Sequence, residues 1–257
     1  MAAAYLALGE AQKALAQTNK AVEALGEDQL ISEYPTQEIW LRHYQALEAL
    51  GSEKAFDALT QAQIRMLDQI ETLSDEGLRR NYLNKVAANR EITLTWAAEA
   101  ARRGIPHDRF TAHEPLPGNL REQFRRVAEA GSRFTAQHEA HRLADFIVEE
   151  FVEMCGAERV LLLLLDEADE LQTAATFNPG DAGELARPLL ASLRRSRQPL
   201  LREGVAGLQN GSVADLQSSD VPQWEYRSLI ALPLIAQGRL MGMLYGDMRQ
   251  IFGRFDE

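Results

Sequence analysis

The chain has 257 residues, of which 46% are hydrophobic and 25% charged, and its formal net charge is -11. This length favours two compact domains, the composition is that of a folded globular protein, and the surplus of carboxylates opposes binding to nucleic acid. No apolar run approaches the roughly 20 residues of a membrane-spanning helix, and no signal peptide is evident. Cys155 is the only cysteine, which excludes an internal disulfide. We therefore expect a cytoplasmic protein without membrane contact.

The first hundred residues are rich in Ala, Leu, Gln and Glu and have few β-branched residues, so helix propensity and pattern agree. Small residues recur seven apart after a glycine, as Ala14 and Ala21 do after Gly9 and as Ala55 and Ala62 do after Gly51. Alanine at such positions lets two antiparallel helices approach closely at a glycine turn. The sequence therefore predicts an all-α segment with an internal repeat.

This pattern resembles tetratricopeptide repeats, over residues 2 to 25 and again over 36 to 65. On one face of the second copy, Trp40, Tyr44 and Leu47 stand at helical spacing and would pack against the following helix. The resemblance implies a surface that contacts another protein. A generic array of helical hairpins remains the alternative.

A further helix is expected from about Gly77 to Arg103, with Leu83, Val86, Ile92 and Trp96 on its apolar side. Gly104 and Pro106 would end it, and the proline-rich stretch after them suits an extended connector. The predicted division is a helical segment at 1–104, a linker at 105–118 and a second domain at 119–257.

The second domain is expected to be of α+β class. Apolar residues between Leu120 and Met154 recur at helical spacing and predict two helices or one bent helix. The run ERVLLLLLDEADELQTAATF then predicts a strand, an acidic turn and a second strand. A helix from Asp181 to Arg195, a short strand at 197–202 and a polar loop at 204–222 follow. The run SLIALPLIAQGRLMGMLYGD predicts a buried hairpin that turns at Gln-Gly.

The helix ending in CGAERV, the strand pair around DEADE and the hairpin RSLIALPLIAQGRLMGMLYGD together resemble a GAF domain, a small-molecule sensory module, over about residues 119 to 257. The resemblance implies a central antiparallel sheet flanked by helices, with a ligand cavity under loops on one face. Aromatic rings there could stack on a flat ligand while polar groups fix its orientation. By position, the ligand-binding residues would be Phe177, Asn178, Asp215, Trp224, Tyr226 and Ser228. The alternative is that these aromatics close a ligand-free core.

No catalytic or metal-binding set is expected, because the sequence has no GxSxG nucleophile, no phosphate loop and no HExxH pair. Cys155 precedes the first strand, where it would not attach a bilin, and a single cysteine is insufficient for the disulfide chemistry of sulfoxide-reducing members. The NKFDE signature of cyclic-nucleotide members is also missing, since the terminal FDE follows Gly253-Arg254. Cyclic-nucleotide binding stays an open alternative, and the cofactor stays unknown.

The sequence thus predicts a non-catalytic signalling fragment, whose GAF domain senses a small molecule or relays a signal through a homodimer built on the helices from Leu120 to Met154. The helical repeats would contact a protein partner. The competing hypothesis is an assembly scaffold with a collapsed, ligand-free GAF cavity. An enzyme hidden in the GAF pocket is a weaker third hypothesis.

Overall fold

The computed structural model describes residues 1–26, 35–73, 75–105, 129, 131, 140–209, 212–214 and 223–255. The chain divides into two compact units. Unit 1 takes the described parts of Met1–Leu73 and Lys85–Arg109, and unit 2 takes those of Ser74–Asn84 and Phe110–Glu257. The prediction divided the chain into consecutive segments at residues 104 and 118. The contacts instead assign Ser74–Asn84, which lies in the N-terminal half, to unit 2.

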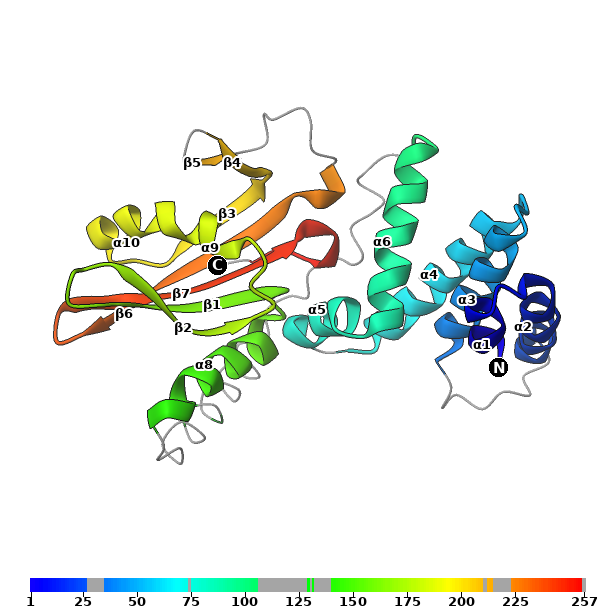
Figure 1. Ribbon diagram of the computed structural model, residues 1–257, viewed down its shortest axis with the longest axis horizontal. Helices are drawn as coiled ribbons and strands as arrows, with labels where there is room; N and C mark the ends of the chain where they lie inside the picture. Colours follow the sequence, from blue (N-terminus) through cyan, green and yellow to red (C-terminus); the bar gives the residue numbers. More distant parts are fainter. Residues whose placement is uncertain are drawn as a thin grey trace. The chain divides into compact units, whose positions relative to one another are not determined.

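Unit 1 is entirely helical in its described part, as predicted. Its helices are α1 (Ala2–Ala7), α2 (Ala11–Gly26), α3 (Thr36–Ala49), α4 (Ala55–Glu71) and α6 (Ala87–Arg102). Each helix packs against its neighbour along the chain, and α6 lies against both α3 and α4 (Figure 1). Large apolar side chains fill the centre without exposed surface, among them Leu41, Leu59, Met66, Ile70 and Ile92.

The expected glycine turns of unit 1 are present. Gly9 and Gly51 both have positive φ, at 73° and 66°, in the turns that join α1 to α2 and α3 to α4. Glycine reaches this left-handed region without steric cost, so it reverses the chain in few residues. Ala14 and Ala62 are fully buried in the helices that follow these turns, which is where the sequence placed small residues.

The prediction of a single helix from Gly77 to Arg103 is wrong. The structure has two helices there, α5 (Glu76–Asn84) and α6, and the chain between them is extended at Val86, with φ -74° and ψ 113°. Val86, expected in the apolar stripe, is 42% exposed. The break separates the two units, because α5 packs within unit 2 and α6 within unit 1.

Unit 2 is built on a five-stranded antiparallel sheet in the order β2-β1-β7-β6-β3. The strands are β1 (Arg159–Leu165), β2 (Leu171–Phe177), β3 (Leu200–Val205), β6 (Arg227–Ala236) and β7 (Arg239–Arg249). Among the described strands, the short β4 (Gly207–Gln209) and β5 (Ser212–Ala214) pair with each other in a separate sheet. The α+β class is therefore confirmed, with β7 and β6 as adjacent inner strands.

The predicted hairpin between β6 and β7 is confirmed. Its ten cross-strand pairs run from Arg227↔Arg249 to Ala236↔Arg239, with one register shift after Leu234. The turn residues Gln237 and Gly238 both have positive φ, at 50° and 75°. Positive φ at both central residues is the geometry of the type I′ turns whose twist matches that of paired strands.

Helices cover the two faces of the sheet differently (Figure 1). The helix α8 (Ala140–Cys155) packs on one face, through Val148 and Val152 against Val160, Leu162 and Leu244. The other face is covered by α9 (Ala182–Ala186), η2 (Arg187–Leu189) and α10 (Leu190–Ser196), which pack on Leu161, Leu163, Leu229, Ala231, Met243 and Tyr245. Side chains alternate between faces along each strand, so each strand serves both cores.

The remaining short elements, η3 (Gln223–Glu225) and η4 (Gln250–Phe252), precede β6 and follow β7. None of the described helices combines the length and hydropathy of a membrane-spanning segment.

Candidate functional site

A cluster of charged side chains lies at one end of the sheet, on the face covered by α9 and α10. Asp247 on β7 is directly opposite Arg159 on β1 and Leu229 on β6, and Leu229 belongs to the apolar core of that face. Residues that are directly opposite, or two apart on one strand, point to the same side. Arg159, Arg227, Tyr245 and Asp247 therefore share one face.

Asp247 is the centre of this cluster and has no exposed surface. Arg159 donates to it from Nε at 2.8 Å and from Nη2 at 2.7 Å, Arg227 donates from Nε at 2.7 Å, and the Tyr245 hydroxyl donates at 2.6 Å. A buried carboxylate is tolerated only when it is paired and hydrogen-bonded. Two guanidinium groups and a phenol meet that condition here.

A second carboxylate, Glu158, lies beside this centre and is 6% exposed in its side chain. It accepts from Arg227 Nη2 at 2.8 Å and from the Arg249 backbone N–H at 3.2 Å, and Arg249 Nη2 stands 3.5 Å from it. Arg227 therefore links the two carboxylates, Asp247 and Glu158. This sharing fixes the orientation of its guanidinium plane.

The outer side of Arg159 is covered by the loop from Asn178 to Asp181. Arg159 Nη1 is paired with the Asp181 carboxylate, whose side chain is 71% exposed. A β-carbon built on Gly180 would stand 3.6 Å from Arg159 Nη1, so the loop backbone itself lies over the guanidinium. Asn178 and Gly180 both have positive φ, at 44° and 47°, which lets the chain turn sharply here.

Neighbouring charges shift the pKa values of Arg159, Asp181 and Tyr245. Burial lowers the pKa of Arg159, but the hydrogen bond to Asp247 and the charges of Asp247 and Asp181 outweigh burial and raise the pKa above its ordinary value. Partial burial raises the pKa of Asp181, and the attraction of Arg159 more than reverses this, so the pKa is lowered. Burial, then Asp247, raises the pKa of Tyr245 well above that of a free tyrosine. Such a site can bind an anion through guanidinium nitrogens.

The structure scatters the ligand-binding residues that the sequence predicts. Phe177 packs on the α8 side of the sheet, and Ser228, on that side too, accepts the Phe255 backbone N–H at 3.0 Å. Tyr226 is buried, with its carbonyl oxygen accepting the Gln250 N–H, and Trp224 is half-buried in η3. Asn178 alone lies in the loop over Arg159, and Asp215 is outside the described residues. Their role as ligand contacts stays a prediction.

Sequence reasoning missed Arg159, Arg227, Glu158 and Asp247 as a group. The signal available was period-2 alternation, which puts Tyr245 and Asp247 on the same face as Met243. A charged residue on the core-facing side of an apolar strand is rarely left without a partner. The partners themselves come from β1 and β6, and their pairing depends on the sheet order.

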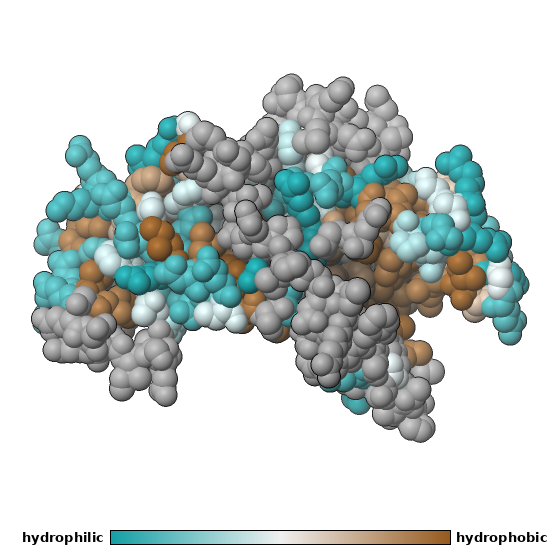
Figure 2. All heavy atoms as spheres, turned by 180° about the vertical axis from the view of Figure 1, so that it is seen from behind, coloured by the Kyte–Doolittle hydropathy of each residue, from teal (hydrophilic) through white to brown (hydrophobic). Residues whose placement is uncertain are grey.

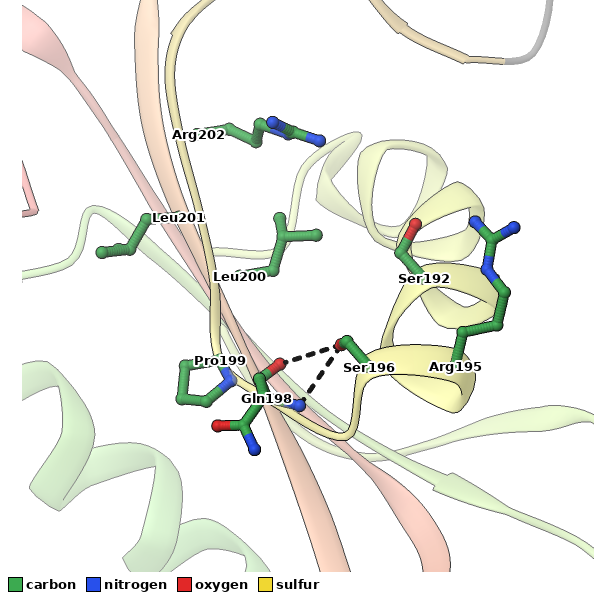
Figure 3. Close-up of a pocket in the computed structure, with 8 residues that line it drawn as sticks. All are labelled: Ser192, Arg195, Ser196, Gln198, Pro199, Leu200, Leu201 and Arg202. Atoms are coloured by element: carbon green, nitrogen blue, oxygen red, sulfur yellow. Dashed lines mark hydrogen bonds between the residues drawn. The ribbon is translucent and has the colours of Figure 1, made fainter.

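An open groove of about 520 Å³ lies between α10 and the edge strand β3 (Figure 3). Leu200 points into it from β3, and the guanidinium groups of Arg195 and Arg202 stand at one end with Ser192 between them. At the other end, Ser196 is tied to the backbone of Gln198. None of the described residues that line the groove carries a carboxylate, so the groove favours anions. Its arginines are exposed to water, which weakens any such attraction.

Comparisons with known proteins place the sheet-containing part of the chain. Residues 139–256 match the family model described as GAF domain. No family match identifies tetratricopeptide-like repeats in the N-terminal helical region. No curated protein matches the sequence.

Solved structures with a similar fold include GAF domains of phosphoenolpyruvate-protein phosphotransferases. The one from Coxiella burnetii is 18% identical over 55% of this chain and 84% of its own, with a TM-score of 0.42. The one from Acinetobacter is 15% identical over 52% and 79%, with a TM-score of 0.37. The chromophore-binding domain of a Stigmatella aurantiaca bacteriophytochrome is 16% identical over 55% of each chain, with a TM-score of 0.37.

Proposed function

We propose that the chain is a non-catalytic signalling protein of the cytoplasm, because residues 139–256 form a GAF domain, a small-molecule-binding sensory and regulatory module. Its GAF domain binds a small anionic molecule at the charged cluster around Arg159. Its N-terminal helices, as tetratricopeptide-like repeats, contact a partner protein.

The observation that supports an anionic ligand is the unequal pairing of the Arg159 nitrogens. Its inner nitrogens are held by Asp247, which has no exposed surface, whereas its outer nitrogen is paired with Asp181, which is 71% exposed. Only the Asp181 side of this ion pair is exposed, because Arg159 itself has 11% of its side chain exposed, so release of Asp181 returns a mostly hydrated carboxylate to water. An incoming carboxylate or phosphate can therefore replace Asp181 at small cost while Asp247 keeps the guanidinium in place.

Replacement of Asp181 also gives the domain a way to respond. Asp181 immediately precedes α9, and α9 packs on the sheet through Ala182, Leu185 and Ala186. Release of the Asp181 side chain frees the Asn178–Asp181 loop from Arg159. Ligand binding would thus change the start of the helical layer over the sheet, which is the change that a relay needs.

Ligand-dependent melting of the full chain tests this proposal. Inorganic phosphate, a set of nucleotides and a set of dicarboxylates are the probes, since a ligand that binds the folded state raises its melting temperature by mass action. In wild type, at least one anion should raise the melting temperature of the sheet-containing unit. In Asp181→Asn, which removes the competing carboxylate, the same anion should bind several-fold more tightly.

Asp169→Asn is the matched control, because Asp169 is also an exposed carboxylate paired with an arginine, Arg194, at 2.9 Å. It should leave the anion affinity unchanged. An equal gain in both variants would point to general electrostatics instead of the Arg159 site. No shift with any probe, in wild type and Asp181→Asn alike, would remove the sensor proposal.

Relay through a homodimer is the second part of the proposal, and the α8 side of the sheet supports it. Ile230, Leu232 and Leu234 on β6 are only partly buried there, and Leu164 is 40% exposed. Figure 2 shows hydrophobic side chains reaching the surface over this sheet. Burial of such a patch against a second copy is favourable. Light scattering that finds a strict monomer would count against it.

The assembly scaffold is the competing function, and one observation favours it. The three guanidinium groups of Arg159, Arg227 and Arg249 already face three carboxylates, Asp247, Glu158 and Asp181. A cluster that is neutral by itself can serve stability alone. The melting experiment separates the two functions, because a scaffold gives no ligand-dependent shift.

A further inference from the structure

The helix α5 lies between α4 and α6 in the sequence but belongs to the compact unit that contains the GAF sheet. It packs against α8 and η4 (Figure 1). It is only nine residues long, and yet five of them are buried, including Arg79, Arg80 and Asn84. A short polar helix that buries this many residues is held by specific contacts and not by an apolar stripe.

One face of α5 meets the carboxyl end of α8. Gly77, Arg80, Asn81 and Asn84 are spaced at i, i+3, i+4 and i+7, so they line a single face of the helix. The last carbonyl groups of any helix lack partners within it and need donors from elsewhere. The carbonyl oxygens of the last turn of α8 therefore need donors from outside α8.

Side chains of α5 donate hydrogen bonds to four carbonyl groups at the carboxyl end of α8. Asn81 Nδ2 donates to the oxygens of Val152 and Glu153, both at 3.1 Å. Arg80 Nη1 donates to Cys155 O at 3.3 Å, and Asn84 Nδ2 donates to Gly156 O at 2.7 Å. Hence α5 acts as a C-terminal cap for α8.

Two glycines allow the backbones to approach closely enough for this cap. A β-carbon on Gly77 would stand 2.1 Å from Met154 O. A β-carbon on Gly156 would stand 2.4 Å from Arg80 Cβ, and Gly156 also has a φ of 69°. Neither position accepts a side chain without movement of α5 against α8. The contact is thus specified from both sides.

Arg80 extends the contact to the other end of the GAF domain. Its Nη2 donates to Arg254 O, and its guanidinium lies 5.7 Å from the centre of the Phe255 ring. Phe255 in turn packs in the core under α8. A single buried arginine of α5 therefore ties together the end of α8 and the segment that follows β7.

We propose that α5 couples the GAF domain to the N-terminal helices. It lies in the N-terminal half of the sequence and caps α8. Through its connections to α4 and α6, it passes a change in α8 to these two helices. The physical basis is connectivity. The helix α4 ends at Glu71 and α6 begins at Ala87, so α5 is joined to unit 1 of the chain at both ends by a few residues. A shift of the last turn of α8 must either carry α5 with it or break the cap.

Hydrogen exchange on the whole 257-residue chain tests the coupling without any ligand. Asn81→Ala removes two capping donors and should speed amide exchange in the last turn of α8, including the Gly156 N–H that bonds to Val152 O, by about tenfold. Gly156→Ala, made on the other side of the contact, should speed exchange in α5. Because α4 and α6 receive the change, exchange should also speed up in their turns next to α5, whereas exchange in α1, which packs on α2 and α3, should stay unchanged in both variants.

Leu78→Ala is the control on the same helix, because Leu78 is 44% exposed. It should leave exchange in α8 at the wild-type rate. The proposal is overturned if Asn81→Ala leaves α8 unchanged, if it acts only on unit 1, or if Leu78→Ala has the same effect as Asn81→Ala. Should Gly156→Ala prevent folding, Asn84→Ala takes its place and should speed exchange around Gly156 by a similar factor.

Discussion

Asp247 shows what one buried charge requires of its surroundings. It has no exposed surface and accepts hydrogen bonds from Arg159, Arg227 and Tyr245. Removal of water from a carboxylate is costly, and the attraction of two guanidinium groups offsets that cost only while all partners are in place. The cluster is therefore stable as a set and weak when one member is missing.

Replacement of Asp247 by Asn should lower the free energy of unfolding of the GAF domain by about 3 to 5 kcal/mol, because Arg159 and Arg227 then lose their shared counter-charge. Asp169→Asn, at an exposed pair with Arg194, should cost about 1 kcal/mol or less. Urea unfolding of the two variants measures the difference. Equal losses would mean that burial of the cluster contributes nothing specific.

Tyr245 makes the free energy of unfolding of the GAF domain fall as the pH becomes alkaline. Burial, then the charge of Asp247, raises the pKa of its phenol in the folded state. The protonated phenol therefore stabilises the fold fully below the unfolded pKa of about 10, and this contribution is lost as pH rises through the folded pKa. In Tyr245→Phe, the fall in unfolding free energy between pH 9 and 11 should be shallower.

Urea unfolding at a series of pH values checks this, with Tyr44→Phe as the comparison. Burial also raises the pKa of Tyr44, followed by its hydrogen bond to Glu48, but Tyr44 lies in unit 1. Tyr44→Phe should change only the unfolding of the helical unit. Identical pH slopes in wild type and Tyr245→Phe would contradict the assignment.

At the scale of elements, local pattern predicts those whose residues alone determine them. The hairpin of β6 and β7 follows from two apolar runs around Gln237-Gly238, and α8 follows from its amphipathic spacing. The break between α5 and α6 was missed, because Lys85 and Val86 are both compatible with a helix. The break forms because α5 packs against the end of α8, which is remote in sequence. Arg80 and Asn84 donate hydrogen bonds there, and Gly77 lets the two backbones approach closely.

The candidate site could be predicted only in part for the same reason. The loop after β2 was expected near the ligand, and Asn178 does begin the loop that covers Arg159. Phe177 and Ser228 were expected beside it, but strand alternation turns both toward α8. Face assignment depends on register, and a shift of one residue moves every side chain to the opposite face. Sheet order and register are tertiary properties.

At the scale of the whole molecule, each unit has its own core and should melt by itself. Leu59 and Leu229 are both fully buried, the first in unit 1 and the second under α9 and α10. Loss of a buried leucine side chain costs about 2 to 5 kcal/mol, through lost burial and the cavity left behind. Leu59→Ala should lower one thermal transition and Leu229→Ala the other, as measured by differential scanning calorimetry.

Leu83→Ala tests whether α5 unfolds together with the helical unit or with the sheet-containing unit. Leu83 is fully buried on α5, and this helix stands between α4 and α6 in sequence but packs against α8 and η4 of the sheet-containing unit. Its replacement should therefore lower the same transition as Leu229→Ala and leave the transition of Leu59→Ala in place. If it follows Leu59 instead, α5 is energetically part of the helical unit. A helix that unfolds with the sheet, and that only a few residues join to α4 and to α6, can carry a change from the sheet-containing unit to these two helices.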